Sequence, residues 1–250
     1  MTEAPAIPAA TLILVREAGN GRPPELLMVE RASTMAFAAG ALVFPGGRID
    51  PADHQLGDAL GVEHGDAIVA AVRETLEETA VPVALDPMPS PELAQMLQHE
   101  LLEETPLAVL LDRHRLSVRP AALTLFAHWV PKFHAIRRFD TRFFLAAAPA
   151  GDWQPRVGER ENQSAEWLSA AEVLRRESAG EASLIFPTRC NLQRLAQHDS
   201  IRAMRDDAAR HPVEPISPWV EHRHGERLLT IPAHLGYPVT QEPLDSLWRG

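Results

Sequence analysis

Three glutamates lie close together in a segment with helical spacing. Glu74, Glu77 and Glu78 fall within an arc of roughly 100° on a helix and point away from its apolar face. Acids at this spacing repel one another, and their oxygens are the ligands that Mg²⁺ and Mn²⁺ prefer. We therefore interpret them as a candidate site for a hard dication that would also bind substrate phosphates. In an isolated helix, an ordinary solvated face would be the better interpretation.

A diglycine turn precedes this segment. The run from Phe44 to Asp50 reads FPGGRID. Its two glycines allow close backbone approach and expose carbonyl oxygens that are suitable as hard metal ligands. The turn is weak evidence alone, and its value lies in its combination with the glutamates.

Together, FPGGRID and the RETLEETAV segment of residues 73–81 resemble the Nudix box, G-x5-E-x7-R-E-U-x-E-E-x-G-U with U apolar. The resemblance implies Mg²⁺-dependent hydrolysis of a nucleoside diphosphate linked to another group. It implies metal ligands at Gly46, Glu74, Glu77 and Glu78, and a positioning role for Arg73. The family commonly adds an acid from a later loop.

We assign that additional acid to Glu161 rather than to Glu159 or Glu166, all of which precede Trp167. Glu161 is then a further metal ligand. Glu161 and Glu74 are the two candidates for the group that accepts a proton from the attacking water.

The box departs from the usual pattern in three ways. Arg73 lies 26 positions after Gly47 where the family has 14, so twelve residues are inserted between loop and helix. The isolated glutamate of the box is left unassigned, with Glu63 and Asp66 as nearby acids. Ala80 replaces the final glycine, which would cost about 1–2 kcal/mol if that residue is left-handed; another helix ending is equally consistent.

The expanded box, the FPGG entry, an added helical segment and the RRFDTRFF run of residues 137–144 are similar to the coenzyme A diphosphatase-like branch. That likeness implies coenzyme A or acyl-coenzyme A as substrate, with Arg31, Arg48 and Arg138 as phosphate contacts. Two alternatives stay open: a hydrolase acting on ADP-ribose, NADH or dinucleoside polyphosphates, and a nucleotide sensor with this fold that does not cleave its ligand.

The surrounding pattern predicts an α/β (α+β) fold, a Nudix-like α/β/α sandwich with a mixed β-sheet and additional helical segments. Val69, Val72 and Leu76 predict a helix over residues 67–79. Ser90 predicts a helix through about residue 103, which we expect outside the catalytic core. The other predicted elements are a hairpin (11–16 and 25–30), strands (41–44, 121–130 and 139–148), a helix after Ser169 and an interrupted helical region (188–210).

We expect one domain over residues 1–250, with a box insertion at about 51–65, a helical segment at about 90–118 and a C-terminal extension with a tail at about 188–250. A net charge of −10 argues against binding a nucleic acid polymer. The single Cys190 excludes an internal disulfide. We expect a cytoplasmic protein without a membrane segment, acting on a small nucleotide-like diphosphate, and consider a homodimer because dimers are common among Nudix proteins.

Overall fold

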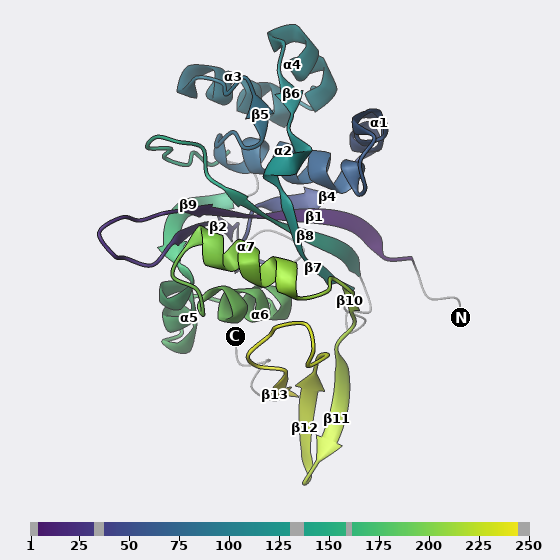
Figure 1. The fold of residues 1–250 in the computed structure, drawn as a ribbon, viewed down its shortest axis with the longest axis vertical. Coiled ribbons are helices and arrows are strands. Elements are labelled where there is room, and N and C mark those ends of the chain that lie inside the picture. The colour runs from purple at the N-terminus through teal and green to yellow at the C-terminus, as the bar shows by residue number, and fades with distance from the viewer. Residues whose placement is uncertain (1–4, 33–37, 131–137, 159–161, 245–250) are drawn as a thin grey trace.

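A mixed eight-stranded sheet lies between two groups of helices (Figure 1). The computed structural model describes residues 5–32, 38–130, 138–158 and 162–244. The strands of this sheet are β1 (Ile7–Arg16), β2 (Glu25–Arg31), β3 (Leu42–Val43), β4 (Gly46–Arg48), β7 (Thr124–Trp129), β8 (Phe139–Ala147), β9 (Asn162–Ser169) and β10 (Pro215–Ile216). The main path runs β10-β7-β8-β1-β2-β3, with β4 paired to β1 and β9 paired to β2. The mixed sheet of the predicted sandwich is therefore confirmed.

Strand β1 is central and is buried on both faces. It runs parallel to β8 and antiparallel to β2 and β4. Leu12 and Leu14 pack into one core, whereas Ile13 and Val15 pack into the other, because successive side chains of a strand point to opposite faces. This double burial explains why the segment is continuously apolar.

Four helices cover one face of the sheet (Figure 1). They are α1 (Pro51–Leu60), α2 (Gly65–Thr79), α3 (Pro91–Leu102) and α4 (Leu107–His114), and the same layer holds the short strands β5 (Leu85–Asp86) and β6 (Ser117–Val118) and the 3-10 turn η1 (Pro120–Ala122). The predicted helix over residues 67–79 is confirmed as α2, and Val69, Val72 and Leu76 are fully buried. Ser90 caps α3 by accepting a hydrogen bond from the Leu93 amide, as predicted.

The opposite face is covered by α5 (Ala170–Ser178), α6 (Phe186–Leu195) and α7 (Ile201–Arg210). Ser169 caps α5 through the Glu172 amide, which confirms the predicted start of that helix. Helices α6 and α7 are the two parts of the interrupted region predicted over residues 188–210. The buried Cys190 lies in α6.

The segment after α7, which the sequence left unspecified, forms a small separate sheet. Its strands are β11 (Trp219–Arg223), β12 (Glu226–Thr230) and β13 (Gln241–Pro243), and the β11–β12 hairpin projects from one end of the molecule (Figure 1). Tyr237 attaches this segment to the main core, because its hydroxyl accepts from Trp129 and donates to Asn191. The tail is therefore packed against the supporting helices.

Two predicted segments differ from the structure. The hairpin is confirmed, with Val15 opposite Leu26, but Gly46–Arg48 is strand β4 and not only a loop. Thr11 and Gly46 are register partners in the β1–β4 pair, so the diglycine run lies beside the central strand. The segment at 51–65, which we treated as an insertion without assigned structure, contains α1.

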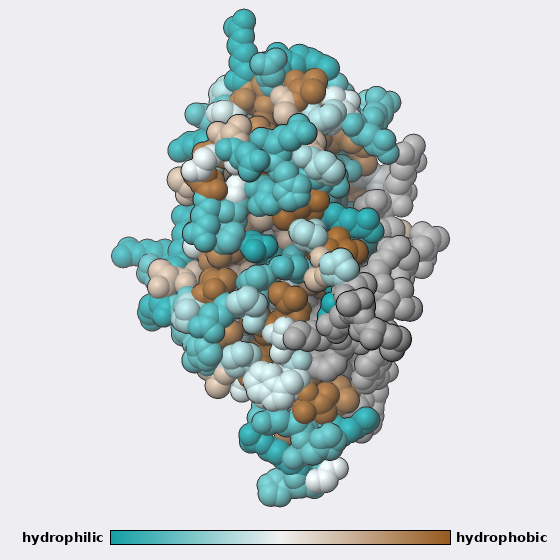
Figure 2. Space-filling view, turned by 90° about the vertical axis from the view of Figure 1, so that its right-hand side faces the viewer, coloured by the Kyte–Doolittle hydropathy of each residue, from teal (hydrophilic) through white to brown (hydrophobic). Residues whose placement is uncertain are grey.

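The face shown in Figure 2 is mainly hydrophilic, with small hydrophobic areas separated by polar side chains. Among the described residues, no helix is long and apolar enough to cross a membrane.

Candidate functional site

The predicted metal ligands Glu74, Glu77 and Glu78 lie on α2, which packs against β4. The Gly46 amide donates a 3.0 Å hydrogen bond to the Glu78 carboxylate, and the Glu78 residue is only 6% exposed. Glu78 therefore lies against the β4 backbone and not in solvent. Helix α2 is enclosed by β1, β4, α1 and α3, so even its acidic side faces protein.

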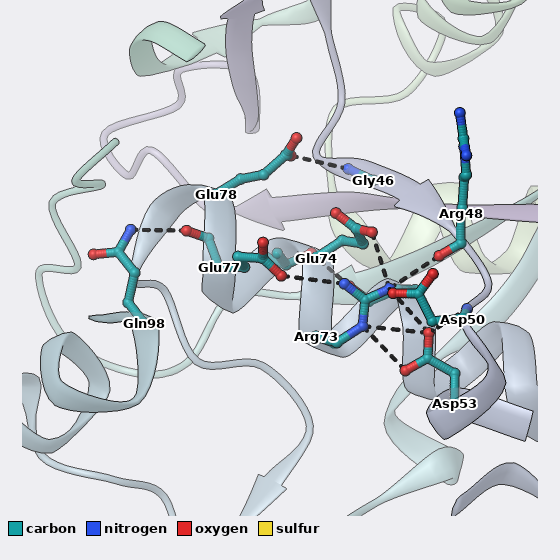
Figure 3. Close-up of polar contacts among 11 residues, drawn as sticks. Gly46, Arg48, Asp50, Asp53, Arg73, Glu74, Glu77, Glu78 and Gln98 are labelled. Atoms are coloured by element: carbon teal, nitrogen blue, oxygen red, sulfur yellow. Dashed lines mark hydrogen bonds and ion pairs between the residues drawn. The ribbon is translucent and has the colours of Figure 1, made fainter. Parts of the chain in front are cut away.

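Gly47 provides space for Glu74. A Cβ atom added to Gly47 would lie 2.6 Å from the Glu74 carboxyl carbon, far closer than real side-chain contacts. The glycine thus lets a carboxylate lie directly against the β4 backbone. Glu74 and Glu78, one helical turn apart, both approach the Gly46–Gly47 backbone (Figure 3).

Arg73 lies at the centre of the polar network beneath these glutamates (Figure 3). Its Nη2 lies 3.0 Å from Glu74 Oε1 and donates at 2.9 Å to the Arg48 carbonyl, while its Nη1 donates at 3.1 Å to Glu77. One guanidinium therefore joins α2 to β4 and restrains two of the three glutamates. The Glu77 carboxylate is turned toward Arg73 rather than toward the diglycine backbone.

Asp53 completes this network, and the sequence analysis missed it. The Asp53 carboxylate is 1% exposed and accepts from Arg73 Nε at 3.1 Å, from Arg73 Nη2 at 2.9 Å and from the Asp50 amide at 2.9 Å. It lies six residues after Gly47, the distance of the isolated acid in G-x5-E. Counting forward from Gly47 would have found it; counting backward from Arg73 led to Gly65.

If Asp53 takes the place of the isolated acid of the box, the extra residues lie between Asp53 and Arg73, within the predicted interval between loop and helix. Most of them form the rest of α1 and the turn into α2. Neither Glu63 nor Asp66 contacts Arg73 in the interactions that the described residues show: Glu63 pairs with His64, and Asp66 pairs with His54.

The surroundings of Glu74 shift the pKa of its carboxyl group. Burial raises the pKa of its carboxyl well above the ordinary value, Arg73 opposes the rise, and the neighbouring Glu78 and Glu77 charges add to it. Burial alone would lower the pKa of Arg73, but the charges of Glu74 and Asp53 raise it. Arg73 is therefore a permanent cation, whereas the negative charge of Glu74 is incompletely compensated.

Helix α2 ends at Ala80, which occupies the place of the final glycine of the box. Ala80 has φ 56°, so it is left-handed, and its amide donates to the Leu76 carbonyl. The structure thus settles which ending the helix adopts. An alanine in this conformation costs about 1–2 kcal/mol relative to the right-handed region, and here it is tolerated at a buried cap.

The donor set suits a hard dication in its chemistry. Buried carboxylate oxygens beside backbone carbonyls are oxygen donors of the kind that Mg²⁺ and Mn²⁺ bind, and a cation would offset the charge on Glu74. Within the part of the chain that the structure describes, no three acidic, histidine or cysteine side chains are grouped closely enough to hold an ion as they stand. The Glu77 carboxylate is ion-paired with Arg73.

The remaining predicted site residues come from other parts of the chain. Arg48 is exposed, and it contributes its backbone carbonyl to Arg73. Arg31 ends β2, and the Arg138 carbonyl accepts from the Ile7 amide at the start of β1. Glu161 lies outside the described residues, as does Glu159, and Glu166 is ion-paired with Arg176 on the α5 side.

Helix α3, which begins after Ser90, contacts the last turn of α2, the helix that carries the three glutamates. Gln98 of α3 donates a 3.0 Å hydrogen bond to the carbonyl of Glu77 (Figure 3). The sequence gives no signal for this contact. Gln98 lies far from the box along the chain and belongs to no recognisable motif.

Comparison with known proteins supports the class that the fold and site define. No protein-family model matches the chain. A NUDIX hydrolase from Alicyclobacillus acidocaldarius is 28% identical and superposes with a TM-score of 0.69, over 82% of this chain and 97% of that one.

Two further solved structures are more distant. A MutT protein from Methanosarcina mazei Go1 is 15% identical, with a TM-score of 0.48 over 79% of this chain and 97% of that one. The NUDIX domain of Shewanella oneidensis NrtR, complexed with ADP ribose, is 13% identical, with a TM-score of 0.46 over 78% and 88%. At these values the two likenesses bear on neither family nor ligand.

The sandwich, with the diglycine strand against the acidic helix and the Arg73 network, is a Nudix-like fold. Over most of its length the chain is similar to a Nudix hydrolase, the Alicyclobacillus enzyme.

Proposed function

We propose that this protein hydrolyses a diphosphate linkage in a nucleoside diphosphate derivative and requires Mg²⁺ or Mn²⁺. The observation that carries the proposal is the meeting of Glu74 and Glu78 with the Gly46–Gly47 backbone. An acidic pair enclosed against a strand backbone has little structural value without a cation, because buried like charges destabilise a fold. The same pair is useful in an enzyme that must bring a dication to a phosphate group.

The proposed metal ligands are the Gly46 carbonyl and the carboxylates of Glu74, Glu77, Glu78 and Glu161. A dication held there would neutralise the diphosphate and lower the pKa of a bound water. Arg73 orients Glu74 and Glu77 through ion pairs, and Asp53 fixes the Arg73 guanidinium through hydrogen bonds.

Proton transfer is assigned to Glu74 or Glu161. Burial raises the pKa of Glu74 above the ordinary glutamate value in the metal-free protein, and a carboxylate with a raised pKa is a stronger base. Arg31, Arg48 and Arg138 are proposed to bind phosphate oxygens of the substrate. Arg48 is the nearest of them in sequence to the diglycine backbone, and its exposed side chain extends from β4 (Figure 3).

Coenzyme A or acyl-coenzyme A is the proposed substrate. The support comes from the sequence, namely the expanded box and the FPGG and RRFDTRFF runs. The alternatives are ADP-ribose, NADH and dinucleoside polyphosphates, which carry the same reactive linkage.

The direct test is a substrate panel. Purified protein is incubated with Mg²⁺ and, separately, with coenzyme A, ADP-ribose, NADH and a dinucleoside polyphosphate, and phosphorylated products are quantified. We expect coenzyme A to be cleaved fastest into two phosphorylated products. Binding of a panel member without any product would contradict hydrolysis and indicate a nucleotide sensor.

A matched pair of variants separates the site from general effects. Glu78→Gln should lower turnover by about 100-fold, the upper range for loss of a group that supports a metal site. Glu63→Gln makes the same chemical change at a side chain that is 88% exposed and should leave turnover unchanged. Equal turnover in the two variants would reject the assignment of Glu78.

A further inference from the structure

Gln98 is a buried polar side chain on a helix face that is otherwise apolar. The residues Ala94, Leu97 and Leu101 of α3 are buried in the core shared with α2, and Gln98 lies among them at 8% exposure. Its amide nitrogen donates to two backbone carbonyls, that of Glu77 at 3.0 Å and that of Arg156 at 2.7 Å. A buried side chain that uses both donors on backbone oxygens is specifically oriented.

The Glu77 carbonyl lies in the last turn of α2, where carbonyl groups lack partners within the helix. The Leu76 carbonyl is satisfied by the Ala80 amide and the Thr79 carbonyl by the Arg156 amide at 2.7 Å. Gln98 satisfies the Glu77 carbonyl between them. The end of the helix that carries Glu77 and Glu78 is therefore bound from outside by α3 and by the segment around Arg156.

The segment around Arg156, between β8 and β9, is held by the same helix. The Arg156 guanidinium donates at 3.1 Å to Gln95 of α3, while Gln98 binds the Arg156 carbonyl. Gln98 thus joins three parts of the chain that are distant in sequence: α3, the last turn of α2 and the β8–β9 connection.

We propose that Gln98 is a positioning residue of the metal site, acting through the Glu77 backbone to fix the direction of the Glu77 and Glu78 carboxylates. This inference rests on the proposed function. An apolar residue of similar volume at position 98 would preserve the packing but remove the hydrogen bonds to the Glu77 and Arg156 carbonyls, and this would loosen the attachment of the last turn of α2 to α3. A shift of this turn moves both carboxylates relative to Gly46.

The test is Mn²⁺ affinity, measured by the electron paramagnetic resonance signal of free Mn²⁺ in the absence of substrate. Gln98→Met removes both donors at nearly constant volume and should weaken Mn²⁺ binding by about 10-fold, as losses of groups that orient metal ligands do. Gln95→Met makes the same change on the same helix and removes only the Arg156 side-chain contact. It should keep Mn²⁺ affinity within about twofold, as surface substitutions do.

Denaturant unfolding in EDTA is recorded for each variant, so that stability and affinity are separated. If Gln98→Met does not fold, Gln98→Asn keeps a buried amide that is one methylene too short to reach both carbonyls, and it should show the same weakened binding. A loss of stability with wild-type Mn²⁺ affinity would show that Gln98 is only structural and would overturn the inference. Absence of Mn²⁺ binding by the wild-type protein would overturn the proposed function as well, so the two failures are distinguishable.

Discussion

Glu74 is a carboxylate in an environment that disfavours its charge. Burial and the neighbouring Glu77 and Glu78 raise its pKa, and Arg73 compensates only in part. A group whose pKa is raised in the folded state stabilises the protein below its unfolded pKa, and this contribution is lost as pH rises through the folded pKa. The metal-free protein therefore loses stability from Glu74 as pH rises above the ordinary glutamate range.

Glu74→Gln is expected to stabilise the metal-free protein. Removing the charge should raise the free energy of unfolding in EDTA by about 1 kcal/mol near pH 8, with a smaller gain near pH 4, where the wild-type carboxyl is protonated. The same variant should lose the stabilisation that Mn²⁺ gives the wild type. Urea unfolding at the two pH values, with and without Mn²⁺, measures both effects; a destabilised variant at pH 8 in EDTA would contradict this electrostatic interpretation.

Gly47→Ala should act through Glu74. The new Cβ would lie 2.6 Å from the Glu74 carboxyl carbon, so the carboxylate must move and Mn²⁺ affinity should fall about 10- to 100-fold. A double-mutant cycle with Glu74→Gln isolates the cause. If the glycine acts by making room for Glu74, adding Gly47→Ala to Glu74→Gln should have little further effect, and fully additive losses would contradict that reason.

At the residue scale, the placement of the candidate site residues on one helix could be predicted because spacing within a helix fixes which side chains share a face. The three glutamates and Arg73 lie at predicted positions on α2. The orientation of Glu77 toward Arg73 was not readable, since it depends on which carboxylate the guanidinium selects. Asp53 could have been predicted by counting forward from Gly47 along the box pattern. The role of Gln98 could not, because its contacts join segments that are remote in sequence.

At the element scale, the residues inserted into the box extend helix α1 and leave the contact between Asp53 and Arg73 in place. The first residues of α1 carry Asp53 to Arg73, and the rest of α1 packs along the start of α2. Gly57 and Gly65 lie at this contact, where a Cβ atom on Gly57 would lie 2.6 Å from the Gly65 carbonyl carbon. The glycines allow the two helices to approach at backbone distance.

Gly57→Ala tests this contact because the two effects of the substitution have opposite signs. Helix propensity alone would stabilise α1 by about 0.5–1 kcal/mol, whereas the close contact with α2 should destabilise the protein by about 1–3 kcal/mol. We expect net destabilisation by denaturant unfolding, with weaker Mn²⁺ binding because Asp53 moves with α1. A net gain in stability would show that the helices tolerate a methyl group between them.

The helices and long strands were predictable because periodicity, caps and apolar runs are local signals. Strand β4 was not, because a three-residue Gly-Gly-Arg strand has no strand-like composition and exists only by pairing with β1. Helix α1 was also missed, although Asp50-Pro51 is a typical helix start, because the segment was interpreted as an insertion.

At the scale of the whole molecule, the sheet separates a site layer from a supporting layer. The supporting layer contains a buried ion pair, with Arg194 Nε 2.7 Å from Asp207 and exposures of 2% and 7% for the two side chains. Arg194 also donates to the Phe126 carbonyl and lies over the Phe126 ring. This pair joins α6, α7 and β7 on the face opposite α2.

Asp207→Asn should therefore separate stability from metal binding. Removing one partner leaves Arg194 as an uncompensated buried charge, which costs about 3–5 kcal/mol. Mn²⁺ affinity of the folded variant should remain that of the wild type, because the pair lies across the sheet from the site. Unchanged stability would contradict the cost assigned to the buried charge, and a weakened Mn²⁺ site would show that the two layers are not independent.

The fold class was predictable at this scale because alternating strand and helix patterns with a central apolar strand permit few layered arrangements. The small β11–β12–β13 sheet was not, since its short strands are stabilised by contacts with the main core such as that of Tyr237.

Anomalous diffraction from crystals grown with Mn²⁺ tests the central claim most directly. We expect an anomalous peak between the Gly46 carbonyl and the carboxylates of Glu74 and Glu78, and loss of that peak in Glu78→Gln crystals. A peak elsewhere in the molecule, or none at this position at a Mn²⁺ concentration that supports hydrolysis, would contradict it.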